Sequence, residues 1–350
     1  MTKKLRFVTD KTAVLIITSV NRRYLTGFSS SLGYLLLTNK GNFLFVDGRY
    51  IEAAQKQASN ATVLKLENIA EQLNKIFKEQ EAQKLLIEVE NDISTFTYLK
   101  KALIVKVSAS AALSERLKVL RSIKTSAEVD CIIAAQQIAE RAFEEILNFI
   151  RVGVTEREIA AFLEYKIKSF GSERFAFDTI VVSGKNSSMP HGVPTDKPIE
   201  AGDFITMDYG AVYGGYLSDM TRTVAVEYAT DEMNEVYNTV LKAQEAVIKV
   251  VKQGITCGEA DKAARQVIEN AGYGEFFTHS TGHGVGLEIH EIPSLSSVAT
   301  QEKLKAGQIV TDEPGIYLPE KFGVRIEDML LIGKSGCKNL TKAEKRLIIL

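Results

Sequence analysis

The sequence contains few cysteines, and their spacing excludes several kinds of site. Its three cysteines, Cys131, Cys257 and Cys337, lie far apart, so they form no C-x-x-C pair and no zinc-type spacing. This pattern favours a reducing compartment with buried or idle thiols, and we expect a cytoplasmic protein. The sequence also lacks a G-x-S-x-G motif, which argues against a serine hydrolase.

Long hydrophobic runs and an excess of one charge are also missing. No stretch approaches the roughly 20 apolar residues that a membrane-spanning helix needs. The apolar run 13–17 follows a short basic stretch, but it is too short for a signal peptide, so we expect a buried first strand. The 43 lysines and arginines nearly balance the 44 aspartates and glutamates. Composition therefore indicates no nucleic-acid and no membrane partner.

The length of 350 residues favours two domains, because a single domain usually has about 100–150 residues. Short apolar runs typical of strands alternate with helical patterns in the first third, at 14–17, 34–37, 43–46 and 85–89. The turn at 39–42 predicts a hairpin. We expect a mixed α/β domain over residues 1–120.

The rest of the chain, residues 121–350, predicts an α+β domain. Capping-box patterns that begin helices occur at Thr125–Glu128, Thr155–Glu158 and Thr256–Glu259. The first of these helices should run to about residue 150. Apolar strand patterns follow at 204–207, 223–226 and 309–311. The similar segments 152–156 and 253–257 lie about a hundred residues apart and indicate two related halves.

Histidines are concentrated in one part of the second domain. All four fall within one stretch of about a hundred residues: His191, His279, His283 and His290. A single histidine is more often a surface or core residue than a ligand. Four of them in glycine- and proline-rich surroundings instead indicate a functional site.

His279 and His283 have the four-residue spacing of zincin helices, but their surroundings are too rich in glycine for a helix interior. We therefore expect them on a strand or loop, where the glycines allow close approach of the backbone. The segment 282–286 has the pattern G-x-G-x-G and lacks the G-x-G-x-x-G spacing of a dinucleotide-binding loop.

Four carboxylates lie at predicted strand ends. Asp208 ends the strand 204–207, and Asp219 begins the next one. Glu313 and Glu327 repeat the arrangement, each in an apolar context near glycine. Such carboxylates need a counter-charge, because burying an unpaired ion costs several kcal/mol. Facing carboxylates on adjacent strands indicate a cation between them.

Four carboxylates and one histidine favour divalent ions such as Mn²⁺, Co²⁺ or Zn²⁺ over metals that prefer thiolates. Five protein ligands are too many for one catalytic zinc, which has three protein ligands and an open position. Two ions about 3.5–4 Å apart fit better, since such a pair can activate water and polarise a carbonyl. This interpretation predicts amide hydrolysis.

Five motifs of the second domain resemble those of the pita-bread metallopeptidases, the family of Xaa-Pro aminopeptidase, prolidase and methionine aminopeptidase. They occur in family order, at 207–210, 218–223, 282–286, 313–317 and 325–328. The resemblance implies that Asp219 and Glu327 bridge two metal ions. It implies that Asp208 completes the coordination of one ion, while His283 and Glu313 complete the coordination of the other.

The same resemblance implies roles beyond metal binding. Glu313 takes a proton from the attacking water, and His191, His279 and His290 surround the substrate and stabilise the tetrahedral intermediate. Arg325, two residues before a ligand, either supports the metal ligands or faces the substrate, and a structural salt bridge is an alternative.

Residues 21–28 and 46–50 resemble the creatinase-type amino-terminal domain of the proline-directed branch, which methionine aminopeptidases typically lack. A single histidine in the motif 190–192 is more similar to the aminopeptidase form than to the prolidase form. The resemblance therefore implies a metal-dependent Xaa-Pro aminopeptidase, with manganese as the expected metal. It also implies peptides with proline at the second position as substrates, and a homodimer.

Three alternatives remain open at this point. A prolidase would need a pocket arginine that binds the free carboxylate of a dipeptide, and the sequence leaves open whether Arg325, Arg222 or another residue plays that part. A creatinase-like amidinohydrolase has the same layout without metals, and the full ligand set argues against it. A non-catalytic pita-bread binding protein would usually lack ligands and carry basic insertions, and this chain shows neither.

Overall fold

The computed structural model describes residues 5–350, which divide into two compact units. The first unit ends at Arg121, and the second runs from Ser122 to Leu350. The boundary predicted from the sequence lies one residue earlier, between 120 and 121. Within residues 5–350, no helix combines the length and the apolar character that crossing a membrane requires.

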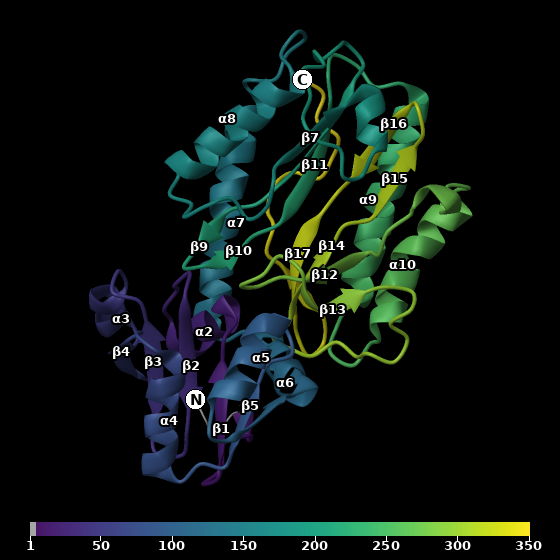
Figure 1. Cartoon of the computed structure of the whole chain (residues 1–350). Helices are drawn as coiled ribbons and strands as arrows, with labels where there is room; N and C mark the ends of the chain where they lie inside the picture. The colour runs from purple at the N-terminus through teal and green to yellow at the C-terminus, as the bar shows by residue number, and fades with distance from the viewer. Residues whose placement is uncertain (1–4) are drawn as a thin grey trace. The chain divides into compact units, whose positions relative to one another are not determined.

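The N-terminal unit is built on a mixed sheet with strand order β4-β3-β2-β1-β5-β6 (Figure 1). Its strands are β1 (Thr12–Ile16), β2 (Gly33–Leu37), β3 (Asn42–Val46), β4 (Thr62–Lys65), β5 (Lys84–Ile87) and β6 (Lys106–Ala109). The predicted hairpin is confirmed, since β2 and β3 pair antiparallel across the turn at 38–41. The expected first strand is confirmed as β1, shifted by one residue.

Helices cover both faces of this sheet. They are α2 (Ser19–Thr26), α3 (Ile51–Gln57), α4 (Ile69–Gln80), α5 (Ile93–Ala102) and α6 (Ala111–Ser122). Side chains of α4 and α5 pack with one set of strand residues, and those of α2, α3 and α6 pack with the alternate set. Because successive strand side chains point to opposite faces, the sheet is buried on both sides, which confirms the predicted α/β class.

The C-terminal unit combines long helices with two antiparallel sheets. Its helices are α7 (Ser126–Ile146), α8 (Glu156–Ser169), α9 (Asp231–Val250) and α10 (Cys257–Asn270). One sheet has the order β11-β8-β7, from β7 (Ile180–Ser183), β8 (Phe204–Tyr209) and β11 (Met220–Ala225). The other has the order β13-β12-β14-β17-β18, from β12 (Gly282–Gly284), β13 (Glu291–Leu295), β14 (Ile309–Asp312), β17 (Asp328–Ile332) and β18 (Cys337–Asn339).

Two short hairpins complete this unit, formed by β9 (Val212–Tyr213) with β10 (Tyr216–Leu217) and by β15 (Gly315–Leu318) with β16 (Phe322–Arg325). Figure 1 shows the strands in the middle of the unit, with α7 and α8 on one side and α9 and α10 on the other. Separate apolar cores lie under α7 and α8 and under α9 and α10. The predicted α+β class is confirmed.

All three predicted capping boxes are present. Thr125, Thr155 and Thr256 each accept a hydrogen bond from the backbone three residues on, and the glutamate at that position bonds back to the cap. This reciprocal pairing satisfies backbone donors that a helix start leaves free. The helix that begins after Thr125 ends at Ile146, four residues before its expected end.

The C-terminal unit repeats one arrangement, as the similar segments 152–156 and 253–257 indicate. The first half has the succession α7, α8, β7, β8, β11, and the second half has α9, α10, β12, β14, β17. Gly153 and Gly254 both have left-handed backbone, with φ of 90° and 94°. Isolated bridges join Thr155 to Pro198 and Thr256 to Lys303. The two halves therefore share local geometry as well as element order.

Candidate metal centre

The predicted metal ligands lie at strand ends of both sheets in the C-terminal unit. Asp208 lies in β8, and Asp219 directly precedes the neighbouring strand β11. His283 lies in β12, where the predicted strand or loop setting is confirmed. Glu313 directly follows β14, and Glu327 directly precedes its partner β17. Each sheet thus contributes acidic groups from two paired strands.

Four of these five residues converge within contact range. His283 Nε2 lies 3.4 Å from Glu313 Oε1 and 3.7 Å from Asp219 Oδ2. Ligand atoms of Asp219, His283 and Glu327 all lie within 4.8 Å of one another. Asp208 is near enough for its charge to act on Asp219, Glu313 and Glu327. The structure therefore gathers the whole predicted ligand set.

Burial and mutual repulsion raise the pKa of three of these carboxyl groups. Burial raises the pKa of Glu313 to about 8, with a further contribution from Asp208. Burial, then repulsion from neighbouring carboxylates, raises the pKa of Asp219 and of Glu327 well above the ordinary values. Charge on this cluster is unfavourable without a counter-ion, and a bound divalent cation supplies it.

Two further observations fit metal ions. Asp208 Oδ1 is buried and has no hydrogen-bond partner within residues 5–350, so its lone pairs are available to a cation. His283 Nδ1 lies 3.2 Å from the Gly284 carbonyl and donates to it, which leaves Nε2 unprotonated and directed at the acids. Burial also lowers the pKa of His283 to about 4, so the ring is neutral near pH 7. The donor set therefore fits divalent metal ions.

Glycine allows the strand that carries His283 to approach its neighbour closely, as expected from the sequence. A Cβ atom on Gly282 would lie 2.1 Å from the Thr311 carbonyl oxygen, which is too close for any side chain. Thr311 Oγ1 accepts a hydrogen bond from the His283 backbone at 3.0 Å and donates to Glu313 Oε1 at 3.1 Å. Thr311 thereby fixes two of the ligands relative to each other.

Arg325 supports the predicted metal ligand Asp208, and four hydrogen bonds hold its side chain in place. Its Nη2 donates to Asp208 Oδ2 at 2.6 Å, and its Nη1 donates to the Tyr317 hydroxyl at 2.8 Å. Nη1 also lies 3.3 Å from the Pro190 carbonyl, and Nε donates to Thr221 Oγ1 at 3.1 Å. The side chain is 4% exposed. Of the roles expected for Arg325, these contacts favour support of Asp208.

His279 takes part in the same hydrogen-bonded chain. Its Nδ1 lies 2.8 Å from the Ser280 carbonyl, so this nitrogen carries the proton. Its Nε2 lies 2.9 Å from the Tyr317 hydroxyl and accepts from it. Burial lowers the pKa of His279 to about 4. Both ring nitrogens are occupied, so the geometry gives His279 a positioning role, and its predicted contact with substrate stays a prediction.

His290 and His191 are exposed and leave their rings open to a ligand. The His290 ring lies against the His283 ring, with 4.3 Å between centroids in a T-shaped arrangement. His191 lies in the loop between β7 and β8, next to Pro190, whose carbonyl faces Arg325. Of the three histidines expected around the substrate, these two keep donors available for it.

Thr221 and Tyr317 belong to the site but were not singled out from the sequence. Thr221 Oγ1 donates to Glu327 Oε2 at 2.7 Å, and Tyr317 connects His279 with Arg325. Thr221 lies two residues after Asp219, so on a strand it points to the same face as this ligand. That alternation was the signal that could have identified Thr221.

Comparisons with known proteins agree with this geometry. Residues 130–334 match metallopeptidase family M24, and residues 10–123 match the creatinase/prolidase N-terminal domain. The chain is 41% identical to a Xaa-Pro dipeptidase of Pyrococcus horikoshii over 338 residues, 96% of this chain and 94% of that protein.

Solved structures show the same fold over the full length. A Xaa-Pro dipeptidase from Bacillus anthracis superposes with a TM-score of 0.94 at 41% identity, covering 99% of this chain and 98% of that one. An X-Pro aminopeptidase from Thermotoga maritima has a TM-score of 0.94 at 36% identity, covering 99% and 100%. The predicted creatinase-like and pita-bread domains are thereby confirmed, and the chain belongs to metallopeptidase family M24.

Proposed function

We propose that this protein is a metal-dependent Xaa-Pro dipeptidase. The observation that carries the proposal is the convergence of Asp219, His283, Glu313 and Glu327, with Asp208 near enough for its charge to act on them. The chain that holds them is similar, over nearly its whole length, to proteins named Xaa-Pro dipeptidase. The sequence motif 190–192 favoured an Xaa-Pro aminopeptidase. The relatives from Pyrococcus horikoshii and Bacillus anthracis, each 41% identical, favour the dipeptidase instead.

The aminopeptidase is kept as the second candidate because of one structural relative. The Thermotoga maritima X-Pro aminopeptidase superposes as well as the dipeptidase does, at the lower identity of 36%. Both candidates hydrolyse the bond before proline, and they differ in whether the chain ends at that proline. The distinguishing group is the free carboxylate of a dipeptide.

The two arginines named as candidates for this carboxylate are both buried and engaged inside the protein. Arg325 is occupied by Asp208 and Tyr317, and Arg222 is 1% exposed with its donors paired inside the protein. The exposed rings of His191 and His290 keep available donors. We infer that His191 binds the substrate carboxylate, which leaves the N–H of His290 for the developing oxyanion.

In the proposed mechanism, two divalent ions held by Asp208, Asp219, His283, Glu313 and Glu327 would supply Lewis acidity to activate water and polarise the scissile carbonyl. Glu313 accepts the proton of the attacking water, a role that suits a carboxyl group with a raised pKa. An N–H of His290 donates to the developing oxyanion. Arg325 holds the Asp208 carboxylate in place through its hydrogen bond to Oδ2.

The test compares two substrates on one preparation. The metal-stripped protein is reconstituted separately with Mn²⁺, Co²⁺ and Zn²⁺, and hydrolysis of Ala-Pro and Ala-Pro-Ala is measured, with Ala-Ala as the control. We expect kcat/KM for the dipeptide to exceed that for the tripeptide by at least about tenfold. A tripeptide preference would identify the aminopeptidase. Absence of metal-dependent cleavage would favour the amidinohydrolase or the binding protein.

Manganese as the metal and the homodimer stay predictions. The same reconstitution decides the metal by comparing kcat for the three ions. Light scattering of the purified protein decides the oligomeric state, where a mass of one 38.6 kDa chain would contradict the dimer.

A further inference from the structure

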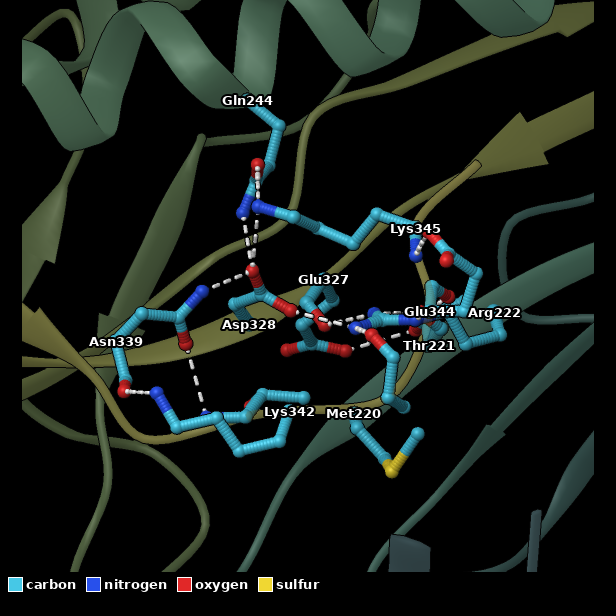
Figure 2. Close-up of polar contacts among 12 residues, drawn as sticks. Met220, Thr221, Arg222, Gln244, Glu327, Asp328, Asn339, Lys342, Glu344 and Lys345 are labelled. Atoms are coloured by element: carbon cyan, nitrogen blue, oxygen red, sulfur yellow. Dashed lines mark hydrogen bonds and ion pairs between the residues drawn. The ribbon is translucent and has the colours of Figure 1, made fainter. Parts of the chain in front are cut away.

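Arg222 lies in β11, one residue after Thr221, in the interior of the C-terminal unit (Figure 2). Because successive strand side chains point to opposite faces, Arg222 points away from the face where Thr221 contacts Glu327. Its side chain is 1% exposed. A buried guanidinium requires a partner for each of its five N–H groups, since an unpaired charged donor costs several kcal/mol.

Each of these five donors has an acceptor. Nη1 donates to the Thr221 carbonyl at 2.9 Å and to the Glu327 carbonyl at 2.6 Å. Nη2 donates to Asp328 Oδ1 at 2.8 Å and to the Ala343 carbonyl at 2.9 Å, and Nε donates to the Glu344 carbonyl at 2.9 Å. One side chain thus joins β11, the segment before β17 and the C-terminal segment.

The main chain of Glu327 depends on β11 for its hydrogen bonds. Glu327 lies between β16 and β17, outside either strand. Its N–H donates to the Thr221 carbonyl at 3.1 Å, and its carbonyl accepts from Arg222. Since the backbone of a residue sets the direction of its side chain, Arg222 helps to determine where the Glu327 carboxylate points.

The C-terminal segment, residues 343–345, is held in the same network. Lys345 Nζ lies 3.1 Å from Asp328 Oδ2 and donates to Gln244 Oε1 at 3.0 Å. The Lys345 carbonyl accepts from the Tyr237 hydroxyl at 2.9 Å. Figure 2 shows Asp328 in the centre of this network, between Arg222 and Gln244. The segment therefore contributes two of the five acceptors of Arg222 and a second cation for Asp328.

We propose that Arg222 is a positioning residue for the metal ligand Glu327, and that the C-terminal segment 343–345 is part of the support of the metal centre. The proposal rests on the proposed metal-dependent function. It assigns a specific effect on the metal affinity of Glu327 to residues that lie far from Glu327 in the sequence. Partners that orient a metal ligand typically change metal affinity 10- to 100-fold when they are removed.

Two variants and one matched control test it. Arg222→Lys keeps the charge but has three N–H donors for five acceptors. Lys345→Met removes the second cation at a side chain that is 24% exposed, where misfolding is less of a risk. Arg346→Met is the control, because the neighbouring Arg346 is 85% exposed and pairs with the Glu344 carboxylate. The measurement is the Mn²⁺ dissociation constant by titration calorimetry, beside thermal unfolding of the metal-free protein.

We expect Arg222→Lys to raise the Mn²⁺ dissociation constant by about 10- to 100-fold and Lys345→Met by about tenfold. The control should stay within about twofold of the parent protein. Variants that unfold at lower temperature but bind Mn²⁺ as the parent does would overturn the proposal. If Arg222→Lys does not fold, Lys345→Met decides alone. A parent protein that binds none of Mn²⁺, Co²⁺ or Zn²⁺ would overturn the metal centre itself, and the positioning role with it.

Discussion

The two halves of the C-terminal unit pair their central strands in the same way but place different residues at the matching position. In the first half, Tyr209 of β8 is paired with Met220 of β11. In the second half, Asp312 of β14 is paired with Asp328 of β17. In both halves, one strand of the pair directly follows a predicted metal ligand, Asp219 or Glu327.

The long helix in front of each pair contributes a glutamine to it. Gln136 Nε2 of α7 lies 3.3 Å from Met220 Sδ, and Gln244 Nε2 of α9 donates to Asp328 Oδ2 at 2.8 Å. The Tyr209 hydroxyl donates to the Ala139 carbonyl at 3.2 Å, so the first-half pair is satisfied by one helix.

The acidic pair of the second half needs more from the rest of the protein. Asp328 is fully buried and accepts from Arg222, Gln244, Asn339 and Lys345. Burial alone would raise its pKa, but Arg222 and Lys345 outweigh burial, so that the pKa of Asp328 is lowered. The same position in the two halves therefore accepts either the apolar pair Tyr209–Met220 or the acidic pair Asp312–Asp328. The acidic pair is also bound by the C-terminal segment, through Lys345.

The largest loss of activity is expected where the two halves are most alike, at the predicted ligands Asp219 and Glu327 that precede β11 and β17. Asp219→Ala and Glu327→Ala should each abolish metal retention and activity, because the family resemblance implies that both carboxylates would contact two ions. Metal content by atomic absorption and turnover of Ala-Pro measure this. Asp196→Ala, at a side chain that is 78% exposed, is the control. Near-normal turnover in either ligand variant would contradict the two-metal centre.

The second-largest effect is expected when Asp328 of the second half is replaced by methionine, the residue at the matching position of the first half. Asp328→Met should lower the free energy of unfolding by about 3–5 kcal/mol, because Arg222 becomes an uncompensated buried charge. Urea unfolding of the metal-free protein measures the change. Met220→Leu is the matched control in the first half, and it should cost less than about 1.5 kcal/mol. If both variants lost the same free energy of unfolding, the buried charge of Asp328 would not be needed to compensate Arg222.

Much of this comparison was predictable from local sequence. The capping boxes at Thr155 and Thr256 fixed the starts of matching helices, because a cap depends on residues within one turn. Asp208 and Asp219 could be placed at strand ends, since apolar runs next to them identify the strands. Both inferences use contacts between neighbours in sequence.

Contacts between distant segments could not be predicted in this way. Nothing near Arg222 in sequence indicates that it bonds the Ala343 and Glu344 carbonyls more than a hundred residues later. Nothing near His279 in sequence indicates that its ring contacts the hydroxyl of Tyr317, 38 residues later. Period-two alternation gives the face of a strand residue but not what that face meets.

The smallest effect concerns Asp312, the other acid of the second-half pair. Asp312 is fully buried, and within residues 5–350 neither of its carboxylate oxygens has a hydrogen-bond partner. Burial, with repulsion from Asp328, raises its pKa well above the ordinary value. An unsatisfied buried polar group typically costs about 1–3 kcal/mol. Asp312 therefore destabilises a position that Tyr209 fills favourably in the first half.

Asp312→Val should accordingly raise the free energy of unfolding of the metal-free protein by about 1–2 kcal/mol, since valine is apolar and favours strands. Asp312→Asn is the control, because its amide would be as unsatisfied as the acid and should give no such gain. Urea unfolding at fixed pH measures both variants. A loss of stability in Asp312→Val would mean that the Asp312 carboxyl group is hydrogen-bonded in solution. Both Asp312 and Asp328 would then stabilise the second half.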